Sequence, residues 1–205
     1  MSAAGRFITL EGVDGAGKST HLQFIADAVA AASGRRAIVT REPGGTDLAE
    51  RLREAILEES LEPMTETLLI FAARAHHVTK VIRPALEAGS WVICDRFLDA
   101  TYAYQGAGKG VPVDLIEELS AASHPGLVPD RTLVFDCSYE VSRQRLVGSG
   151  KKLDRFERED RAFFERVRSA YLARARAEPE RMRIIDAGGE ISSIRNSVQR
   201  ALAFA

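Results

Sequence analysis

Five short apolar segments recur along the chain, and each lacks the strict polar–apolar alternation of a strand with one wet face. They are rich in β-branched and aromatic residues, which favour strands. The pattern predicts five buried strands at Arg6–Leu10, Ala37–Thr40, Trp91–Cys94, Thr132–Phe135 and Arg183–Ile185.

Segments with helical spacing separate these strands. In the first of them Leu22, Ile25 and Val29 share one face, as a period of about 3.6 residues requires. Strands that alternate with helices form a parallel sheet covered on both faces, so we expect a three-layer α/β fold. The predicted helices are Ser19–Ala32, Thr46–Leu57, Thr65–Ala88, Val113–Ala122, Tyr139–Val147, Glu159–Ala177 and Ile191–Phe204.

Composition narrows the possible classes. With 205 residues the chain is expected to form one domain, residues 1–205, because it is too short for two large ones. Hydrophobic residues make up 45% of the chain, which supplies a core and excludes a disordered protein. The 28 Lys and Arg residues balance 29 Asp and Glu residues, so we expect no nucleic-acid partner held by bulk charge.

Several further classes are disfavoured. No apolar run approaches the length of a membrane helix, about 20 residues, and the N-terminus is too polar for a signal peptide, so we expect a cytoplasmic protein with no membrane partner. Cys94 and Cys137 each end an apolar run, which favours buried free thiols over a disulfide or a metal pair. The His residues form no ligand-like group, and His76 and His77 are interpreted as a solvated helix face.

A P-loop motif follows the first strand directly. The sequence GVDGAGKS fits G-x-x-x-x-G-K-[ST], and a helical pattern begins just after it. Glycines let the backbone N–H groups turn toward phosphate oxygens, and the helix adds its positive end. We expect Lys18 to reach the β- and γ-phosphates and Ser19 to bind Mg²⁺. The predicted ATP-binding residues are Gly12, Val13, Asp14, Gly15, Ala16, Gly17, Lys18, Ser19 and Thr20.

A P-loop alone leaves several enzyme classes open. A guanine-reading N-K-x-D motif is missing, because the only Asn is Asn196 and Ser197 follows it, so a GTPase switch is disfavoured. Motor ATPases usually end a strand in Asp-Glu, whereas the third strand here ends in Asp95-Arg96. Two rivals remain: a kinase for another nucleoside monophosphate, and a P-loop ATPase that uses hydrolysis as a switch.

Polar residues follow two further strands. Asp95 and Arg96 lie at the carboxyl end of a central strand, where open α/β sheets bind ligands. The guanidinium group of Arg96 can donate two parallel hydrogen bonds to a second phosphate, and Asp95 can orient Mg²⁺ through water. Arg41–Gly45 (REPGG) follows the second strand and suits a loop against an acceptor nucleotide, although a plain turn has a similar composition.

Taken together, these sites resemble those of thymidylate kinases over essentially the whole chain. The matching stretches are EGVDGAGKST at 11–20, TREPGGT at 40–46, FAAR at 71–74, DRF at 95–97, TYAYQG at 101–106 and LDRFE at 153–157. The resemblance implies a P-loop kinase fold with a five-stranded parallel sheet and a short lid. It also implies ATP with Mg²⁺ as donor, thymidine monophosphate (dTMP) as acceptor, and a homodimer. The helix Thr65–Ala88 is a candidate for the dimer contact; packing of its apolar face against the sheet is the alternative.

The resemblance also assigns roles to single residues. Asp14 would lie near the sugar 3′-OH, Arg96 would hold the acceptor phosphate, and Glu42 belongs to the loop against the acceptor. Family members place a stacking Phe four residues before the Arg that reaches thymine O4; here that place holds Ile70, and Phe71 is next to it. Either could cover the ring. The base and sugar readers implied are Arg74, Thr101, Gln105 and Tyr104, the last crowding a ribose 2′-OH.

The lid is expected at about 148–160, a glycine-flanked and strongly charged stretch (GSGKKLDRFERED). Thymidylate kinases carry either an Arg inside the P-loop or a small residue there with basic residues in the lid. Gly15 fits the second, bacterial pattern. Lys151, Lys152, Arg155 and Arg158 are then candidates to close over the triphosphate. Arg155 is the preferred catalytic cation, beside Lys18, Arg96 and Asp95; a solvated basic loop is the alternative.

Overall fold

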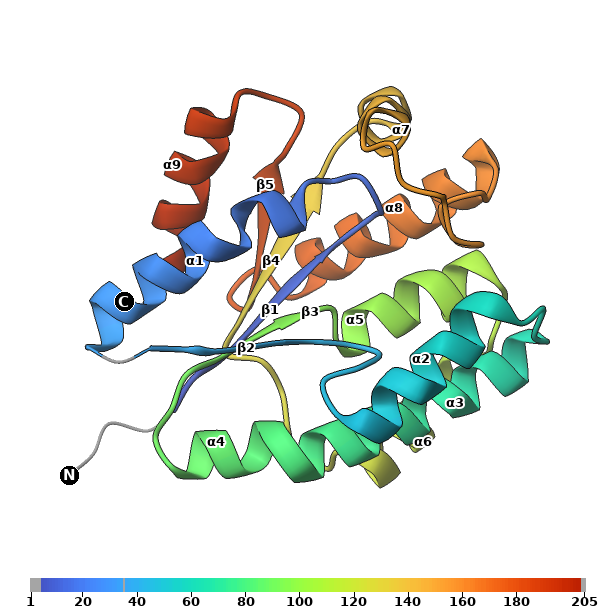
Figure 1. The fold of residues 1–205 in the computed structure, drawn as a ribbon, viewed down its shortest axis with the longest axis horizontal. Coiled ribbons are helices and arrows are strands. Elements are labelled where there is room, and N and C mark those ends of the chain that lie inside the picture. Colours follow the sequence, from blue (N-terminus) through green and yellow to red (C-terminus); the bar gives the residue numbers. More distant parts are fainter. Residues whose placement is uncertain (1–4, 35, 204–205) are drawn as a thin grey trace.

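The computed structural model describes residues 5–34 and 36–203, so residues 1–4, 35 and 204–205, including the predicted helix end at Phe204, lie outside it. One parallel sheet runs through the middle of the molecule, with the strand order β2-β3-β1-β4-β5 (Figure 1). This confirms the predicted five-stranded parallel sheet. The strands are β1 (Phe7–Gly12), β2 (Ile38–Arg41), β3 (Val92–Asp95), β4 (Arg131–Asp136) and β5 (Met182–Asp186).

Helices cover both faces of the sheet. The α-helices are α1 (Lys18–Ser33), α2 (Asp47–Glu58), α3 (Pro63–His77), α4 (Arg83–Glu87), α5 (Leu98–Thr101), α6 (Val113–Ser123), α7 (Tyr139–Gly148), α8 (Arg161–Ala177) and α9 (Ile191–Leu202). Two π-helical segments, η1 (Val78–Ile82) and η2 (Tyr102–Gly108), continue α3 and α5. The predicted helix Thr65–Ala88 is therefore real, but it begins at Pro63 and contains a π-helical stretch.

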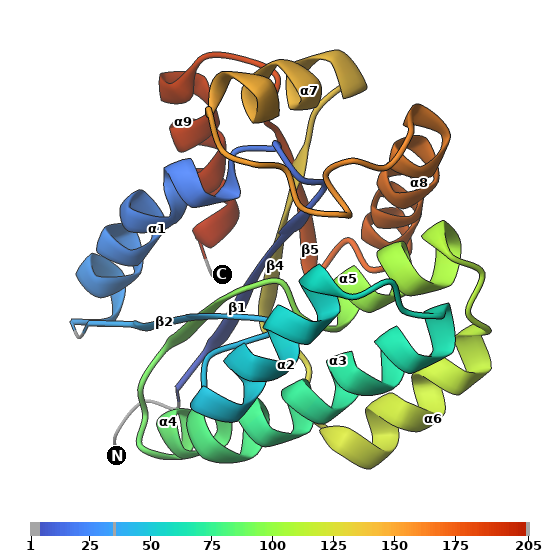
Figure 2. The ribbon, with the colours of Figure 1, turned by 45° about the vertical axis from the view of Figure 1, so that its right-hand side comes forward.

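Alternate residues of β1 face the two helical layers. Ile8 and Leu10 join the core with Ile25 and Val29 of α1, and α1 lies beside α9 in both views (Figures 1 and 2). Phe7 packs on the other face, with η1 and α4. This period of two lets β1 contribute apolar side chains to both sides of the sheet.

One expectation about local structure is wrong, and one helical run was missed. The edge strand β2 is not buried: Ile38 and Val39 are 37% and 44% exposed, because only β3 pairs with it. The helical run Leu98–Gly108 was not predicted. Its buried side chains include Asp99, Thr101 and Gln105, so the inward face has no apolar stripe to detect.

The strand register brings the functional loops together. Leu10 of β1 and Arg41 of β2 both pair with Asp95 of β3, so β2 and β3 end level with each other and β1 runs two residues further, to Gly12. The P-loop, the loop after β2 and the loop after β3 therefore start side by side. Elsewhere, Cys94 and Cys137 are buried free thiols, as predicted. Within the described residues, no helix combines the length and apolar character that crossing a bilayer demands.

Candidate active site

The P-loop curls from β1 into α1 with glycine where other residues would not fit. Gly12 has a φ of 127°, and a Cβ on it would lie 2.2 Å from the Phe135 carbonyl oxygen. The helix α1 begins at Lys18, whose buried Nζ donates to the Gly12 and Val13 carbonyl oxygens, each at 3.1 Å. Burial lowers the pKa of Lys18, and the nearby Arg96 lowers it further. The ammonium thus lies against the loop that would cradle a triphosphate.

The helix α7 packs directly on the P-loop. Ser142 donates from Oγ to the Asp14 carbonyl oxygen at 2.8 Å. A Cβ on Gly15, which has a φ of 73°, would lie 2.6 Å from the Ser142 carbonyl oxygen. Arg145 of α7 donates to the Ala16 carbonyl oxygen at 3.3 Å. The absence of a side chain at Gly15 is therefore also a packing requirement, and Arg145 is a P-loop contact that sequence reasoning missed.

Arg96 lies at the centre of the site. Its Nη2 donates to Asp14 Oδ1 at 2.6 Å and to the Tyr104 hydroxyl at 3.0 Å, while its Nη1 donates to the Tyr171 hydroxyl at 3.1 Å. Although burial opposes it, Tyr104, Asp14 and Tyr171 hold the pKa of Arg96 well above its ordinary value. It is the one non-glycine residue with a positive φ, 69°, among those the structure describes, and such a conformation costs about 1–3 kcal/mol.

Glu11, just before the P-loop, holds the loop after β3 and Tyr171 of α8 in place. Its carboxylate accepts from the Phe97 backbone N–H and from the Tyr171 hydroxyl, each at 2.8 Å. Burial raises the pKa of Glu11 to about 7, and Asp99 adds to the effect. Glu11 thereby connects β1 to the loop after β3 and to α8. Tyr171 is a second contact that sequence reasoning missed, since α8 is distant in the sequence.

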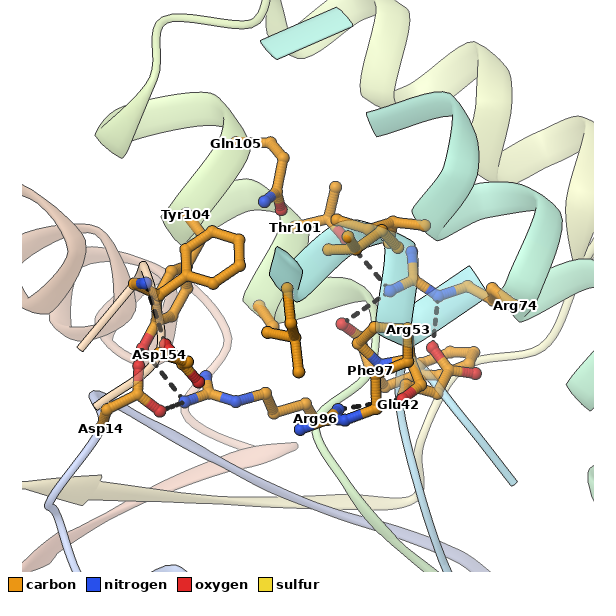
Figure 3. A pocket seen from close by; sticks show the side chains of 16 residues that line it. Asp14, Glu42, Arg53, Arg74, Arg96, Phe97, Thr101, Tyr104, Gln105 and Asp154 are labelled. Carbon is orange, nitrogen blue, oxygen red and sulfur yellow. Dashed lines mark hydrogen bonds and ion pairs between the residues drawn. The ribbon is translucent and has the colours of Figure 1, made fainter. Parts of the chain in front are cut away.

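A buried chain of polar groups holds Arg74 in place. Glu42 accepts from Arg74 Nε at 2.6 Å and contacts His77 Nδ1 at 3.0 Å. Arg74 Nη2 donates to the Thr101 hydroxyl and the Phe97 carbonyl oxygen, both at 3.0 Å (Figure 3). The solvated-face interpretation is wrong for His77, which is fully buried because its side of α3 meets the loop after β2.

These residues surround a cleft with an empty volume of about 580 Å³, including space open to solvent. Arg96 and Asp14 lie at one side of it and Arg74, Thr101 and Gln105 at another (Figure 3). The cleft has room for a flat ring with a polar edge and an attached anion. The predicted substrate residues Asp14, Glu42, Ile70, Arg74, Arg96, Thr101, Tyr104 and Gln105 all line it.

Phe71 is the predicted substrate residue that does not line this cleft. It is buried in a separate apolar cluster with Val111 and Ile116, and its ring stacks on His124 with centroids 6.3 Å apart. Ile70 faces the cleft instead. Of the two candidates for covering a base, the geometry favours Ile70.

Further lining residues were missed, among them Arg53, Ile56 and Phe156. Arg53 and Ile56 come from α2, and Phe156 comes from the α7–α8 connection. Arg53 donates from Nη1 to the Pro43 carbonyl oxygen at 2.9 Å, and burial lowers its pKa, with Arg41 and Arg96 adding to the shift. The only sequence signal for Arg53 is its helical spacing from Ile56, which places both on one side of α2.

The predicted lid joins α7 to α8 and lies over the cleft. Its middle residues, 153–157, are partly buried, and Phe156 packs edge-on against Tyr104 with centroids 5.8 Å apart. Arg155 binds the Ile56 carbonyl oxygen and the Glu66 carboxylate. Its hydrogen-bond partners therefore lie on α2 and α3 and not on the P-loop, and its guanidinium lies over the Phe156 ring. Lys151, Lys152 and Arg158 are exposed.

The donor set near the P-loop suits a hard cation. Asp95 Oδ1 is buried and has no hydrogen-bond partner within the described part of the chain. Ser19 is exposed in the first turn of α1. A carboxylate oxygen and a hydroxyl are ligands, direct or through water, that Mg²⁺ prefers. The residues present therefore fit the predicted metal.

Comparisons with known proteins agree with this geometry. The family model described as thymidylate kinase matches residues 10–198. A thymidylate kinase of Bordetella petrii is 54% identical, covering 98% of this chain and 97% of its own, and one of Methylobacillus flagellatus is 52% identical over 95% of each. The crystal structure of a thymidylate kinase from Ehrlichia chaffeensis matches with a TM-score of 0.78 and 32% identity, covering 97% of this chain and 98% of that one. A family match of this extent, on a fold with the P-loop and the Arg96 site in place, means that the chain belongs to the thymidylate kinase family.

Proposed function

We propose that the protein transfers the γ-phosphate of ATP to dTMP, giving thymidine diphosphate and ADP for the supply of dTTP. The observation that carries the substrate assignment is Arg74 Nη1, a buried donor with no hydrogen-bond partner among the described residues. An unpaired buried donor is costly, so it calls for an acceptor from the ligand. The O4 atom of thymine supplies one.

The cleft orients dTMP by charge and shape. With O4 on Arg74 and the base edge toward Thr101 and Gln105, the phosphate extends toward Arg96 and Arg53. Two guanidinium groups there suit a dianionic phosphate. Tyr104, with its ring against Phe156, occupies the side of the sugar and favours a deoxyribose.

Catalysis of this kind requires positioning and charge stabilisation more than covalent chemistry. An oxygen of the acceptor phosphate is itself the nucleophile, and Arg96 holds it toward the γ-phosphate. Lys18 offsets the charge that develops on the transferring group. When bound, Mg²⁺, held by Ser19 and through water by Asp95, would neutralise charge on the β- and γ-phosphates. The lid excludes water, which limits wasteful hydrolysis of ATP.

A panel of monophosphates tests the substrate assignment. We expect dTMP to exceed the cytidine and guanosine monophosphates by at least about 10³ in kcat/KM, because a mismatched base leaves buried polar groups unpaired. Deoxyuridine monophosphate should lose roughly 10-fold, since it lacks only a methyl group. Coupled ADP-release assays measure all of these. Equal rates with every pyrimidine would contradict the assignment, and steady ATP hydrolysis without an acceptor would favour a switch ATPase.

We also propose that Arg155 supplies a catalytic charge when it exchanges Glu66 for triphosphate oxygens. Arg155→Ala should lower kcat by roughly 10² to 10³, with a smaller change in ATP affinity, as for arginine fingers. Lys151→Ala and Lys152→Ala are matched comparisons and should cost less, because an ammonium offers no planar fork. Steady-state kinetics decides: wild-type kcat in Arg155→Ala would mean that another cation acts.

A homodimer stays a prediction from the resemblance. The face of α3 toward the core uses Ile70 and Phe71, so those residues are not free for a partner. Met64 and Leu68, one turn apart on α3, are 45% and 48% exposed and leave an apolar strip on the outer face. This strip supports the helix as a contact between two copies.

A further inference from the structure

Glu66 on α3 is a fully buried carboxylate to which the proposed reaction gives no contact with either substrate. Its Oε1 accepts from the side-chain amide of Gln105, with Nε2 at 2.8 Å. Its Oε2 accepts from Lys109 Nζ at 2.7 Å and from Arg155 of the lid. The cost of burying a carboxylate is offset when it is paired with cations and hydrogen-bonded in this way.

The two oxygens of Glu66 therefore bind different kinds of partner, one the cations and the other the Gln105 amide. The cations Lys109 and Arg155 balance its charge on one side. On the other side, an ionised carboxylate can only accept hydrogen bonds, so it must face the NH₂ group of Gln105 and not the carbonyl oxygen. The Gln105 Oε1 atom has no hydrogen bond within the described part of the chain and is left as an acceptor at the wall of the cleft, where Figure 3 shows the amide.

This orientation creates a pattern that distinguishes pyrimidines. Arg74 presents a donor and Gln105 an acceptor to the same edge of a base. Thymine offers the complement, an O4 acceptor beside an N3–H donor. Cytosine offers the reverse, an N4 amino donor beside an N3 acceptor. A Gln105 amide turned by 180° would instead present a donor to N3 and would favour cytosine at that position.

We infer that Glu66 is a positioning residue that sets base selectivity by fixing the orientation of the Gln105 amide. The inference rests on the proposed function, because it takes the base of a nucleoside monophosphate as the ligand of Arg74 and Gln105. It differs from a role in stability alone, because it predicts a change in the ratio between two substrates.

Glu66→Gln tests the inference with a side chain of the same shape. Lys109 and Arg155 would draw the carbonyl oxygen of the new amide, so its NH₂ group would face Gln105 and turn that amide over. The ratio of kcat/KM for dTMP over dCMP should fall by about 10- to 100-fold, the scale of one mispaired buried group. Glu62→Gln is the matched control: it makes the same change at an exposed position four residues earlier and should leave the ratio unchanged.

A double-mutant cycle with Gln105→Met separates orientation from general damage. Without the Gln105 amide, Glu66→Gln should no longer change the dTMP/dCMP ratio. A ratio that still falls in that background, or one that does not fall in the single variant, would overturn the inference. If Glu66→Gln does not fold, Glu66→Asp keeps the charge but shortens the reach to Gln105, and it should also lower the ratio. The wild-type protein, measured first, reports on the proposed function: no preference for dTMP would refute that function before the variants are compared.

Discussion

Replacing Lys18 with methionine should lower kcat by roughly 10² or more, the scale seen when one pre-organised charge is removed from a transition state. Lys18 is buried against the P-loop carbonyl oxygens of Gly12 and Val13, where water does not screen its charge. Methionine keeps the apolar stem of the side chain but lacks the terminal ammonium group. Steady-state turnover of ATP and dTMP measures the loss.

Lys80→Met is the control for this variant. Lys80 is exposed on η1, and the same change of side chain there should leave kcat within about two-fold of the wild type, because surface charges contribute little. Near-normal turnover of the Lys18 variant would contradict the P-loop assignment. A loss that is equal in both variants would indicate damage unrelated to the phosphate site.

Arg96→Met should have the largest effect on the acceptor, a fall of about 10³ in kcat/KM for dTMP, because arginine groups that bind transferring phosphates contribute on that scale. The guanidinium is tied to Asp14, Tyr104 and Tyr171, so its direction is set before the substrate arrives. Its removal also leaves the Asp14 carboxylate without its cation.

Arg96→Lys separates charge from geometry. Lysine keeps the positive charge but cannot donate from a planar guanidinium group to three partners. The fall in kcat/KM for dTMP should therefore be smaller in Arg96→Lys than in Arg96→Met. Initial rates at varied dTMP and at varied ATP show which substrate is affected. A variant with a changed KM for ATP and an unchanged kcat/KM for dTMP would place Arg96 on the donor side and refute its assignment to the acceptor.

Local and contiguous features were predictable from the chain. The P-loop is readable because its glycines, Lys18 and Ser19 lie in one short segment between a strand and a helix. The predicted strands lie within about two residues of the observed ones because fully buried parallel strands are short continuous apolar runs. The burial of the edge strand β2 was predicted wrongly, because a strand that pairs on one side only can have the same apolar composition.

Features that depend on which faces meet were not predictable. His77 is buried because α3 turns that residue toward Glu42, which follows β2, and a helix pattern does not say what lies opposite. The choice of Ile70 over Phe71 at the cleft is of the same kind, since adjacent helical positions point about 100° apart and only the packing of α6 and η2 gives Phe71 another place.

The sequence by itself determined the order of the strands and of most helices, the phosphate loop and the family, because each depends on neighbouring residues or on motifs in a set order. Only the tertiary structure decided where the charges of the site are balanced. The partners of Glu66, for example, are 39, 43 and 89 residues away along the chain. Buried charges must be paired, but the pairing partner is whichever element packs alongside, and no local pattern encodes that choice.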